Sequence, residues 1–327
     1  MDHSTMNYRL LAGLTLALAA APSLASDYPL TVRSCERDVT LNKAPQRVVV
    51  HDVNMTGMLL HLGVRERLAG YTGFTATKHR DPWISEALQG VPQLASRYPS
   101  VETLLAVDAD LFFAGWNYGM RVGGPLTPTS LAAFGIPVYE LSESCSWIMK
   151  QPRASLDDVY RDLTNLGRIF SVEDRAQALV SHMRARIEAV GNAVRQGPDA
   201  PRVFLYDSGE DRPTTSGRLG MPQALIDAAG GHNIMDDVTA SWTQVNWESV
   251  VERDPEVIAI VDYGPLSWQQ KRDFLLRHPA LQTVRAIREQ RFVVLTYLEV
   301  TPSVENAIAI EKLAAGLHPR LFAQDSH

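Results

Sequence analysis

The chain has 327 residues, of which 45% are hydrophobic and 21% charged, and its formal net charge at pH 7 is −6. This length is enough for two domains, each with its own hydrophobic core. The mildly negative charge, without a basic stripe, argues against a nucleic acid as a partner.

The N-terminal 25 residues predict an export signal. Residues 10–21 are mostly apolar and follow Arg9, and residues 23–25 (Ser-Leu-Ala) provide small side chains before a cleavage point at Ser26. The apolar stretch is too short for a stable membrane span, which needs about 20 apolar residues. We therefore expect residues 1–25 to be a cleaved signal peptide and the mature protein to be soluble in the periplasm.

The chain contains two cysteines, Cys35 and Cys145. An exported protein with an even number of cysteines usually pairs them, so we expect a disulfide within the first half of the chain. The wide separation and the lack of a CxxC spacing argue against a metal-binding or nucleophilic role.

A strand pattern occurs once in each half. Residues 45–52 (PQRVVVHD) are echoed by residues 201–207 (PRVFLYD). Each is followed by a helical segment that ends before a glycine, at residues 57–62 and 222–229, and a further apolar strand closes each half, at residues 136–141 and 292–297. Short β-branched runs that alternate with helices predict parallel sheets, whose ligands bind at the carboxyl ends of the strands.

A second repeated pattern centres on a glutamate. Glu102 precedes Asp-Ala-Asp at 108–110, and Glu248 precedes Asp-Pro-Glu at 254–256, with five residues between the glutamate and the aspartate in both copies. A helix-capping residue stands two positions before each glutamate, namely Ser100 and Asn246. We expect a short helix with an exposed glutamate in its first turn, then a tight turn and a strand, at 111–114 and 257–261.

The two halves are joined by helical sequence. Apolar residues recur at helical spacing over 156–170, and a capping pattern at 171–174 starts a second stretch that runs to about residue 195. We therefore expect two α/β lobes, each Rossmann-like with a parallel sheet: an N-terminal lobe over 26–155, connecting helices over 156–197 and a C-terminal lobe over 198–327. A helical connector limits hinge motion between lobes.

These features together resemble the helical-backbone class of periplasmic substrate-binding proteins of ABC importers, which includes binders of ferric siderophores, haem and vitamin B12. The similarity covers the mature chain and is most specific at residues 45–54, 99–114, 206–209 and 241–260. It implies a monomer with a ligand cleft between the lobes and no cofactor. It also implies that Glu102 and Glu248 dock on arginines of the permease dimer; without the resemblance they would be solvated acids favoured by the helix dipole.

Candidate ligand-binding residues lie on loops that follow the predicted strands. They are Trp116, Tyr118 and Arg121 in the first half, and Tyr206, Arg212, Arg218, Trp242 and Tyr263 in the second. The stretch around Trp242 resembles the segment of vitamin B12 binders that carries a ligand-stacking tryptophan. Clustered Tyr, Trp and Arg on such loops are typical of binding surfaces, although each aromatic could instead be core. The arginines favour an anionic ferric siderophore, with a corrinoid or haem as the alternative.

Two other classes fit the sequence less well. A bare metal ion would need a compact ligand set, and His51, His61 and His232 do not have the spacing of one. The chain has no GxGxxG, GxSxG, P-loop or HExxH motif, so we expect no enzymatic activity.

Overall fold

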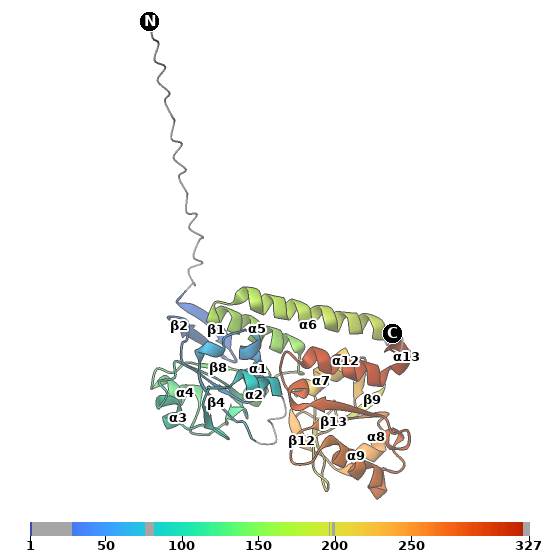
Figure 1. The fold of residues 1–327 in the computed structure, drawn as a ribbon. Helices are drawn as coiled ribbons and strands as arrows, with labels where there is room; N and C mark the ends of the chain where they lie inside the picture. The colour runs from blue at the N-terminus through green and yellow to red at the C-terminus, as the bar shows by residue number, and fades with distance from the viewer. Residues whose placement is uncertain (2–27, 76–81, 196, 198–199, 323–327) are drawn as a thin grey trace.

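The computed structural model describes Met1 and residues 28–75, 82–195, 197 and 200–322, so the expected signal peptide lies almost entirely outside the described residues. Two α/β lobes lie side by side, and one long helix, α6 (Glu173–Val194), crosses both of them (Figure 1). Within the described ranges, no helix is long and apolar enough to cross a membrane.

The N-terminal lobe is built on a parallel sheet in the order β5-β4-β3-β6-β7, with β8 also paired to β6. Its strands are β3 (Val48–His51), β4 (Leu68–Thr72), β5 (Gln93–Ala95), β6 (Leu111–Trp116), β7 (Gly119–Met120) and β8 (Val138–Glu140). Its helices are α1 (Val53–His61), η1 (Arg65–Arg67), α2 (Pro82–Ala87), α3 (Val101–Leu105), α4 (Pro128–Ala132) and η2 (Ser142–Trp147). An antiparallel hairpin of β1 (Leu30–Ser34) and β2 (Arg37–Leu41) precedes the sheet and was not predicted.

The C-terminal lobe has a four-stranded parallel sheet in the order β11-β9-β13-β14. Its strands are β9 (Arg202–Tyr206), β11 (His232–Asn233), β13 (Val257–Asp262) and β14 (Phe292–Thr296), and β10 (Thr214–Ser216) pairs with β12 (Trp242–Gln244) in a separate ribbon. The helices are α7 (Met221–Ala228), α8 (Trp247–Arg253), α9 (Trp268–Arg277), η3 (Pro279–Leu281), α10 (Arg285–Arg288), α11 (Tyr297–Val300), α12 (Asn306–Leu317) and α13 (Pro319–Phe322).

The two sheets share one strand order. In the N-terminal lobe β4, β3, β6 and β8 are successive neighbours, and β11, β9, β13 and β14 follow the same sequence of neighbours in the other lobe. The predicted repeat is therefore a repeat in three dimensions: β3 corresponds to β9, and β6 to β13. Both central strands, β6 and β13, are almost completely buried, as expected for parallel strands covered on both faces.

The connecting sequence forms two helices, as its two helical stretches predicted. α5 (Leu156–Phe170) ends at Ser171, which has a left-handed φ of 55°, and the chain then turns into α6. α5 is strongly amphipathic and buries the face that carries Val159, Leu163 and Leu166. α6 packs on α5 and on α12, so a single element contacts both lobes.

The repeated acids anchor the loops that carry the glutamates. In the N-terminal lobe, Asp110 accepts hydrogen bonds from the backbone N–H of Arg47, while the Arg47 side chain donates to the carbonyl of Val107. In the C-terminal lobe, Glu256 accepts from the N–H of Arg202, whose side chain donates to the carbonyl of Asp254. In both copies, the arginine and the acid of the repeat thus connect the loop after the glutamate helix to the start of a strand, which is β3 in the N-terminal lobe and β9 in the C-terminal lobe.

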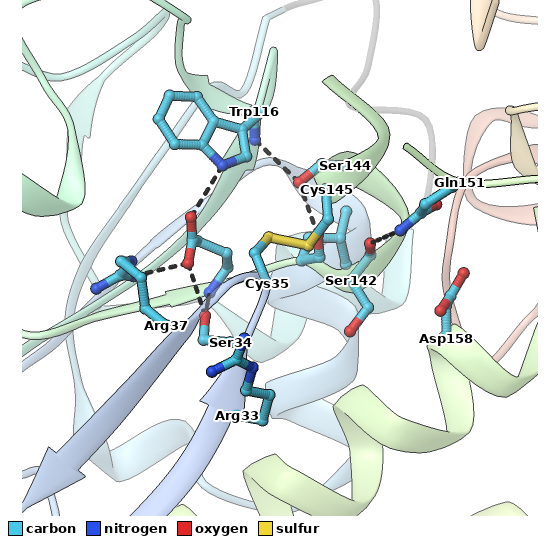
Figure 2. Close-up of a disulfide and its surroundings, with 12 residues drawn as sticks. Arg33, Ser34, Cys35, Arg37, Trp116, Ser142, Ser144, Cys145, Gln151 and Asp158 are labelled. Carbon is cyan, nitrogen blue, oxygen red and sulfur yellow. Dashed lines mark hydrogen bonds and ion pairs between the residues drawn. A yellow bond between two sulfur atoms is a disulfide. The ribbon is translucent and has the colours of Figure 1, made fainter. Parts of the chain in front are cut away.

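The disulfide expected from the sequence is present. Cys35, in the turn between β1 and β2, is bonded to Cys145 in η2, with 5.5 Å between their Cα atoms. Figure 2 shows this bond beside a buried polar network in which Trp116 and Arg37 both donate to the carboxylate of Glu140, at 2.9 and 2.7 Å. The bridge therefore ties the N-terminal hairpin to the segment that follows β8, the last strand of the same lobe.

Candidate functional site

A cavity of about 180 Å³ lies where the two lobes meet at the base of the cleft. It is lined by Tyr118 from the N-terminal lobe and by Asp207, Thr214, Trp242, Tyr263, Tyr297, Val300 and Thr301 from the C-terminal lobe. Four of these residues directly follow, or come within two residues of, the carboxyl end of a parallel strand, which are the positions where this class of sheet binds ligands.

Hydrogen bonds cross between the lobes at the base cavity. The hydroxyl of Tyr297 donates to the carboxylate of Asp52 at 2.9 Å, and Trp242 is hydrogen-bonded to the hydroxyl of Tyr118. The rings of Tyr263 and Tyr297 pack with centroids 5.0 Å apart. The aromatic side chains of this cavity are therefore held in place by contacts to the opposite lobe or to each other.

The ionisable groups around the base cavity are mostly hydroxyls and carboxyls. Burial, strengthened by the nearby Glu143 and Asp52, raises the pKa of Tyr118 well above its ordinary value, and burial beside Asp52 does the same for Tyr297. Burial also raises the pKa of Asp207, against the lowering effect of Ser208 and Lys271. The tyrosines stay neutral, so the cavity offers hydroxyls and carboxyl oxygens to a ligand.

A second cavity, of about 410 Å³, opens at the carboxyl edge of the N-terminal sheet. Its lining includes His51 at the end of β3, Arg97 and Tyr98 after β5, and Arg121 after β7. The guanidinium of Arg121 lies 4.8 Å from the centre of the Tyr98 ring. We call this space the N-lobe cavity and the first one the base cavity.

The matching family description is that of the periplasmic binding proteins, and the match extends over residues 48–297, through both parallel sheets. This chain belongs to that family. Members of the family are solute-binding proteins rather than enzymes, and they serve ABC importers.

Relatives and solved structures agree with this assignment. The binding protein is 29% identical over 238 residues to a cobalamin-binding protein of Halobacterium salinarum, covering 72% of this chain but only 59% of that relative. A periplasmic binding protein from Veillonella parvula superposes with a TM-score of 0.76 at 26% identity, covering 86% of this chain and 94% of the other. An ABC-type Fe3+-hydroxamate transport protein from Saccharomonospora viridis has a TM-score of 0.75 at 24% identity, covering 89% and 99%.

Four of the predicted ligand-binding residues line one of the two cavities. Tyr118, Trp242 and Tyr263 lie in the wall of the base cavity, and Arg121 lies in the wall of the N-lobe cavity. They come from both lobes of the binding protein, as a ligand held between the lobes requires.

Two predicted aromatics are instead part of the lobe interiors. Trp116 is 8% exposed, and its indole N–H donates to Glu140 at 2.9 Å. Tyr206 is 1% exposed and packs against Trp247 and Phe274 in the core of the C-terminal lobe. Neither residue is among those that line the N-lobe cavity or the base cavity.

Two predicted arginines lie outside both cavities. Arg212 is exposed on the loop between β9 and β10. Arg218 is half-buried, and its backbone bonds to Ala154 and Val238 hold the loop before α7 against the N-terminal lobe. Neither is among the residues that line the N-lobe or the base cavity.

The two glutamates occupy the positions that the repeat predicts. Glu102 lies in the first turn of α3, capped by Ser100, and Glu248 lies in the first turn of α8, capped by Asn246. Both side chains are exposed, and the capping serine together with the helix backbone lowers the pKa of Glu102. The Asp that ends each helix motif, Asp108 or Asp254, has a left-handed φ, so the tight turn is also repeated.

Each of the three histidines considered as metal ligands has a different polar neighbour. His51 is hydrogen-bonded to Thr72, His61 to Glu305, and His232 lies 3.8 Å from Asp236. In the part of the chain that the structure describes, no three His, Cys, Asp or Glu side chains gather as metal ligands would.

Several site residues were missed from the sequence. Asp52 and Asp207 follow β3 and β9, and Tyr98 and Tyr297 follow β5 and β14. The repeat contained a signal for the two aspartates, because each is the last residue of the matched segments 45–52 and 201–207. Polar residues in equivalent positions after corresponding strands must converge on the cleft when the lobes face each other.

Proposed function

We propose that this periplasmic binding protein captures a corrinoid in the cleft between its lobes and delivers it to an ABC permease. The observation that carries the proposal is the lining of the base cavity. It combines Trp242 and three tyrosines with the carboxyl group of Asp207, and no arginine or lysine is among its lining residues.

This lining suits a large neutral molecule with many hydrogen-bond donors. A corrin macrocycle carries carboxamide side chains, whose N–H₂ groups donate to carboxylates and to tyrosine oxygens. Its faces pack well on aromatic rings. An anionic ferric chelate in the same cavity would face Asp207 and the neighbouring Asp52, and like charges in a desolvated contact cost several kcal/mol. The relatives named as cobalamin-binding and vitamin B12-binding support the same choice.

A ferric siderophore is the second candidate, as the sequence favoured, and the N-lobe cavity supports it. Arg97 and Arg121 both line that cavity, and guanidinium groups bind carboxylate and hydroxamate oxygens well. One structural neighbour bears the name of an Fe3+-hydroxamate transport system.

Calorimetric titration of the purified protein tests the proposal. Cyanocobalamin, haem, a ferric trihydroxamate and a ferric catecholate are each titrated, with tryptophan fluorescence as a second readout. We expect saturable binding of cyanocobalamin by one molecule per chain. The Trp242→Ala variant should weaken that binding by roughly tenfold, because an aromatic contact contributes about 1 kcal/mol beyond the area it buries.

The control is Trp147→Ala, because Trp147 is exposed and lines neither cavity. If a ferric chelate binds and cyanocobalamin does not, the proposed ligand is a siderophore and not a corrinoid. If none of the four compounds binds, both candidates fall.

A further inference from the structure

The two cavities have opposite electrostatic character. The N-lobe cavity has two arginines, Arg97 and Arg121, among its lining residues and no aspartate or glutamate. The base cavity is lined by Asp207 and has no cationic side chain among its lining residues. A ligand that occupies both must therefore present an anionic group to one end of the cleft and hydrogen-bond donors to the other.

One tight turn contributes a lining residue to each of the two cavities. Residues 115–121 hold Tyr118 in the base cavity and Arg121 in the N-lobe cavity. The turn is closed by backbone hydrogen bonds from Tyr118 to Gly115, at 2.9 Å, and from Asn117 to Met120, at 2.7 Å, with Asn117 at a left-handed φ of 63°. The distance between the two contact points is thus set by a short, internally bonded piece of backbone.

Arg121 is positioned by a fixed aromatic ring. The hydroxyl of Tyr98 donates to the carbonyl of Asn117 at 2.6 Å, and the edge-on His51 ring has its centroid 5.1 Å from that of Tyr98. A guanidinium placed over a ring contacts it with its face, whereas the five N–H donors lie in the guanidinium plane. The donors of Arg121 can therefore bind an oxyanion while the ring contact is kept.

We propose that the N-lobe cavity is an anion subsite, in which Arg121 together with Arg97 binds an oxyanion that belongs to the ligand. The inference rests on the proposed function and deepens it. In a corrinoid the oxyanion is the phosphodiester of the nucleotide loop, so the protein selects complete, nucleotide-bearing corrinoids over those that lack the loop. In a ferric carboxylate chelate the same subsite takes a carboxylate.

Two corrinoids that differ in the phosphodiester test this subsite. Cyanocobalamin carries the phosphodiester, and dicyanocobinamide has the same amide-bearing macrocycle without phosphate, ribose and base. Both are titrated into the wild type, Arg121→Gln, Arg121→Lys and the control Arg320→Gln, whose exposed arginine is on α13 at the far end of the C-terminal lobe (Figure 1). Thermal melts confirm that each variant is folded.

We expect Arg121→Gln to lower the affinity for cyanocobalamin by about tenfold or more, because a charge-assisted hydrogen bond is lost. The affinity for dicyanocobinamide should change by less than about twofold. The affinity of Arg121→Lys for cyanocobalamin should lie between those of the wild type and Arg121→Gln. The affinity of Arg320→Gln should match that of the wild type. Equal losses for both corrinoids, or no loss for either, would overturn the subsite.

A different outcome separates the subsite from the proposed function. If the wild type binds neither corrinoid, the corrinoid proposal fails, and ferric dicitrate is titrated into the same variants. A loss of ferric dicitrate affinity in Arg121→Gln alone supports the anion subsite with a carboxylate ligand. Unchanged affinity, or no binding of ferric dicitrate by the wild type, overturns it.

Discussion

At the scale of single residues, the contact between the lobes includes a buried carboxylic acid. Glu143, in η2 of the N-terminal lobe, accepts a hydrogen bond at 3.1 Å from the hydroxyl of Ser241 in the C-terminal lobe. Burial, opposed by the hydrogen bond from Ser241 and aided by the nearby Asp158 and Asp162 of α5, raises its pKa to about 7. The carboxyl group in this contact between the lobes therefore titrates close to neutral pH.

The Glu143→Gln variant should change how stability depends on pH. Between about pH 4.5 and 7 the folded wild type holds a proton on Glu143 that the unfolded chain has released, so its free energy of unfolding falls as pH rises through this window and levels off above it. The total fall is on the order of 3 kcal/mol. Glutamine stays neutral, so the variant should gain stability relative to the wild type over that range.

Urea unfolding at pH 5 and pH 8 measures this difference. Glu188→Gln on α6 is the control, because Glu188 is exposed. Asp162, whose pKa burial also raises to about 7, is present in both proteins, so both pH profiles retain a fall of its own near neutral pH. Parallel pH profiles for the wild type and Glu143→Gln would contradict the assignment.

At the scale of elements, the turn between β6 and β7 decides the geometry of the cleft. Gly119 has a φ of 97°, and a Cβ atom at this position would lie 2.7 Å from the ring of His51. His51 is itself buried against Thr72, so it has little room to move. Only glycine fits at this position.

Gly119→Ala should therefore both destabilise the protein and lower its affinity for the ligand. We expect a loss of about 1 to 3 kcal/mol in the free energy of unfolding, from the strained backbone and the collision with His51. Gly123→Ala is the matched control, since Gly123 also has a positive φ, of 74°, but no atom within 4 Å of the added Cβ. Equal effects of the two substitutions in urea unfolding would show that backbone strain alone accounts for the loss.

The disulfide links the β1–β2 hairpin to η2 within the N-terminal lobe. It closes a span of 110 residues, and in the chain-entropy model such a closure contributes up to about 4 to 5 kcal/mol. The double variant Cys35→Ser/Cys145→Ser should have a lower melting temperature and still fold, because each lobe keeps its own core. Mass spectrometry of unreduced exported protein should find no free thiol, and two free thiols or an unchanged melting temperature would count against this.

At the scale of the whole molecule, Glu102 and Glu248 lie on corresponding helices of the two lobes. α6 crosses the top of Figure 1, whereas α3 and α8 lie lower, one in each lobe. The pair is therefore suited to a partner that touches both lobes at once, as a permease dimer would.

Replacing both glutamates by arginine should separate binding from delivery. The double variant should bind ligand with nearly wild-type affinity, because neither glutamate is among the residues lining the cavities. If the glutamates dock on arginines of the permease, as we propose, the double variant should fail to support uptake, because like charges in such a contact cost several kcal/mol. Ligand affinity and uptake are measured together, with Glu188→Arg on α6 as the control. Wild-type uptake, or a loss of uptake that tracks an equal loss of affinity, would reject the docking role.

Local rules were enough to determine much of this architecture from the sequence. Helix caps at Ser100 and Asn246, the alternation of short strands with helices and the repeated strand segments predicted two lobes with parallel sheets. The even cysteine count predicted the disulfide. These features depend on residues close in sequence or on composition, so no distant contact had to be known.

Tertiary structure alone decided which side chains face the cleft. Trp116 and Tyr118 are two residues apart, yet Trp116 is turned into its lobe by a hydrogen bond to Glu140 on the neighbouring strand, and Tyr118 reaches the base cavity after the left-handed Asn117. Tyr206 is covered by Trp247 and Phe274, which are distant in the sequence. The direction of a side chain at a strand end changes with a single turn residue and with the partner it meets, and that partner is known only once the chain has folded.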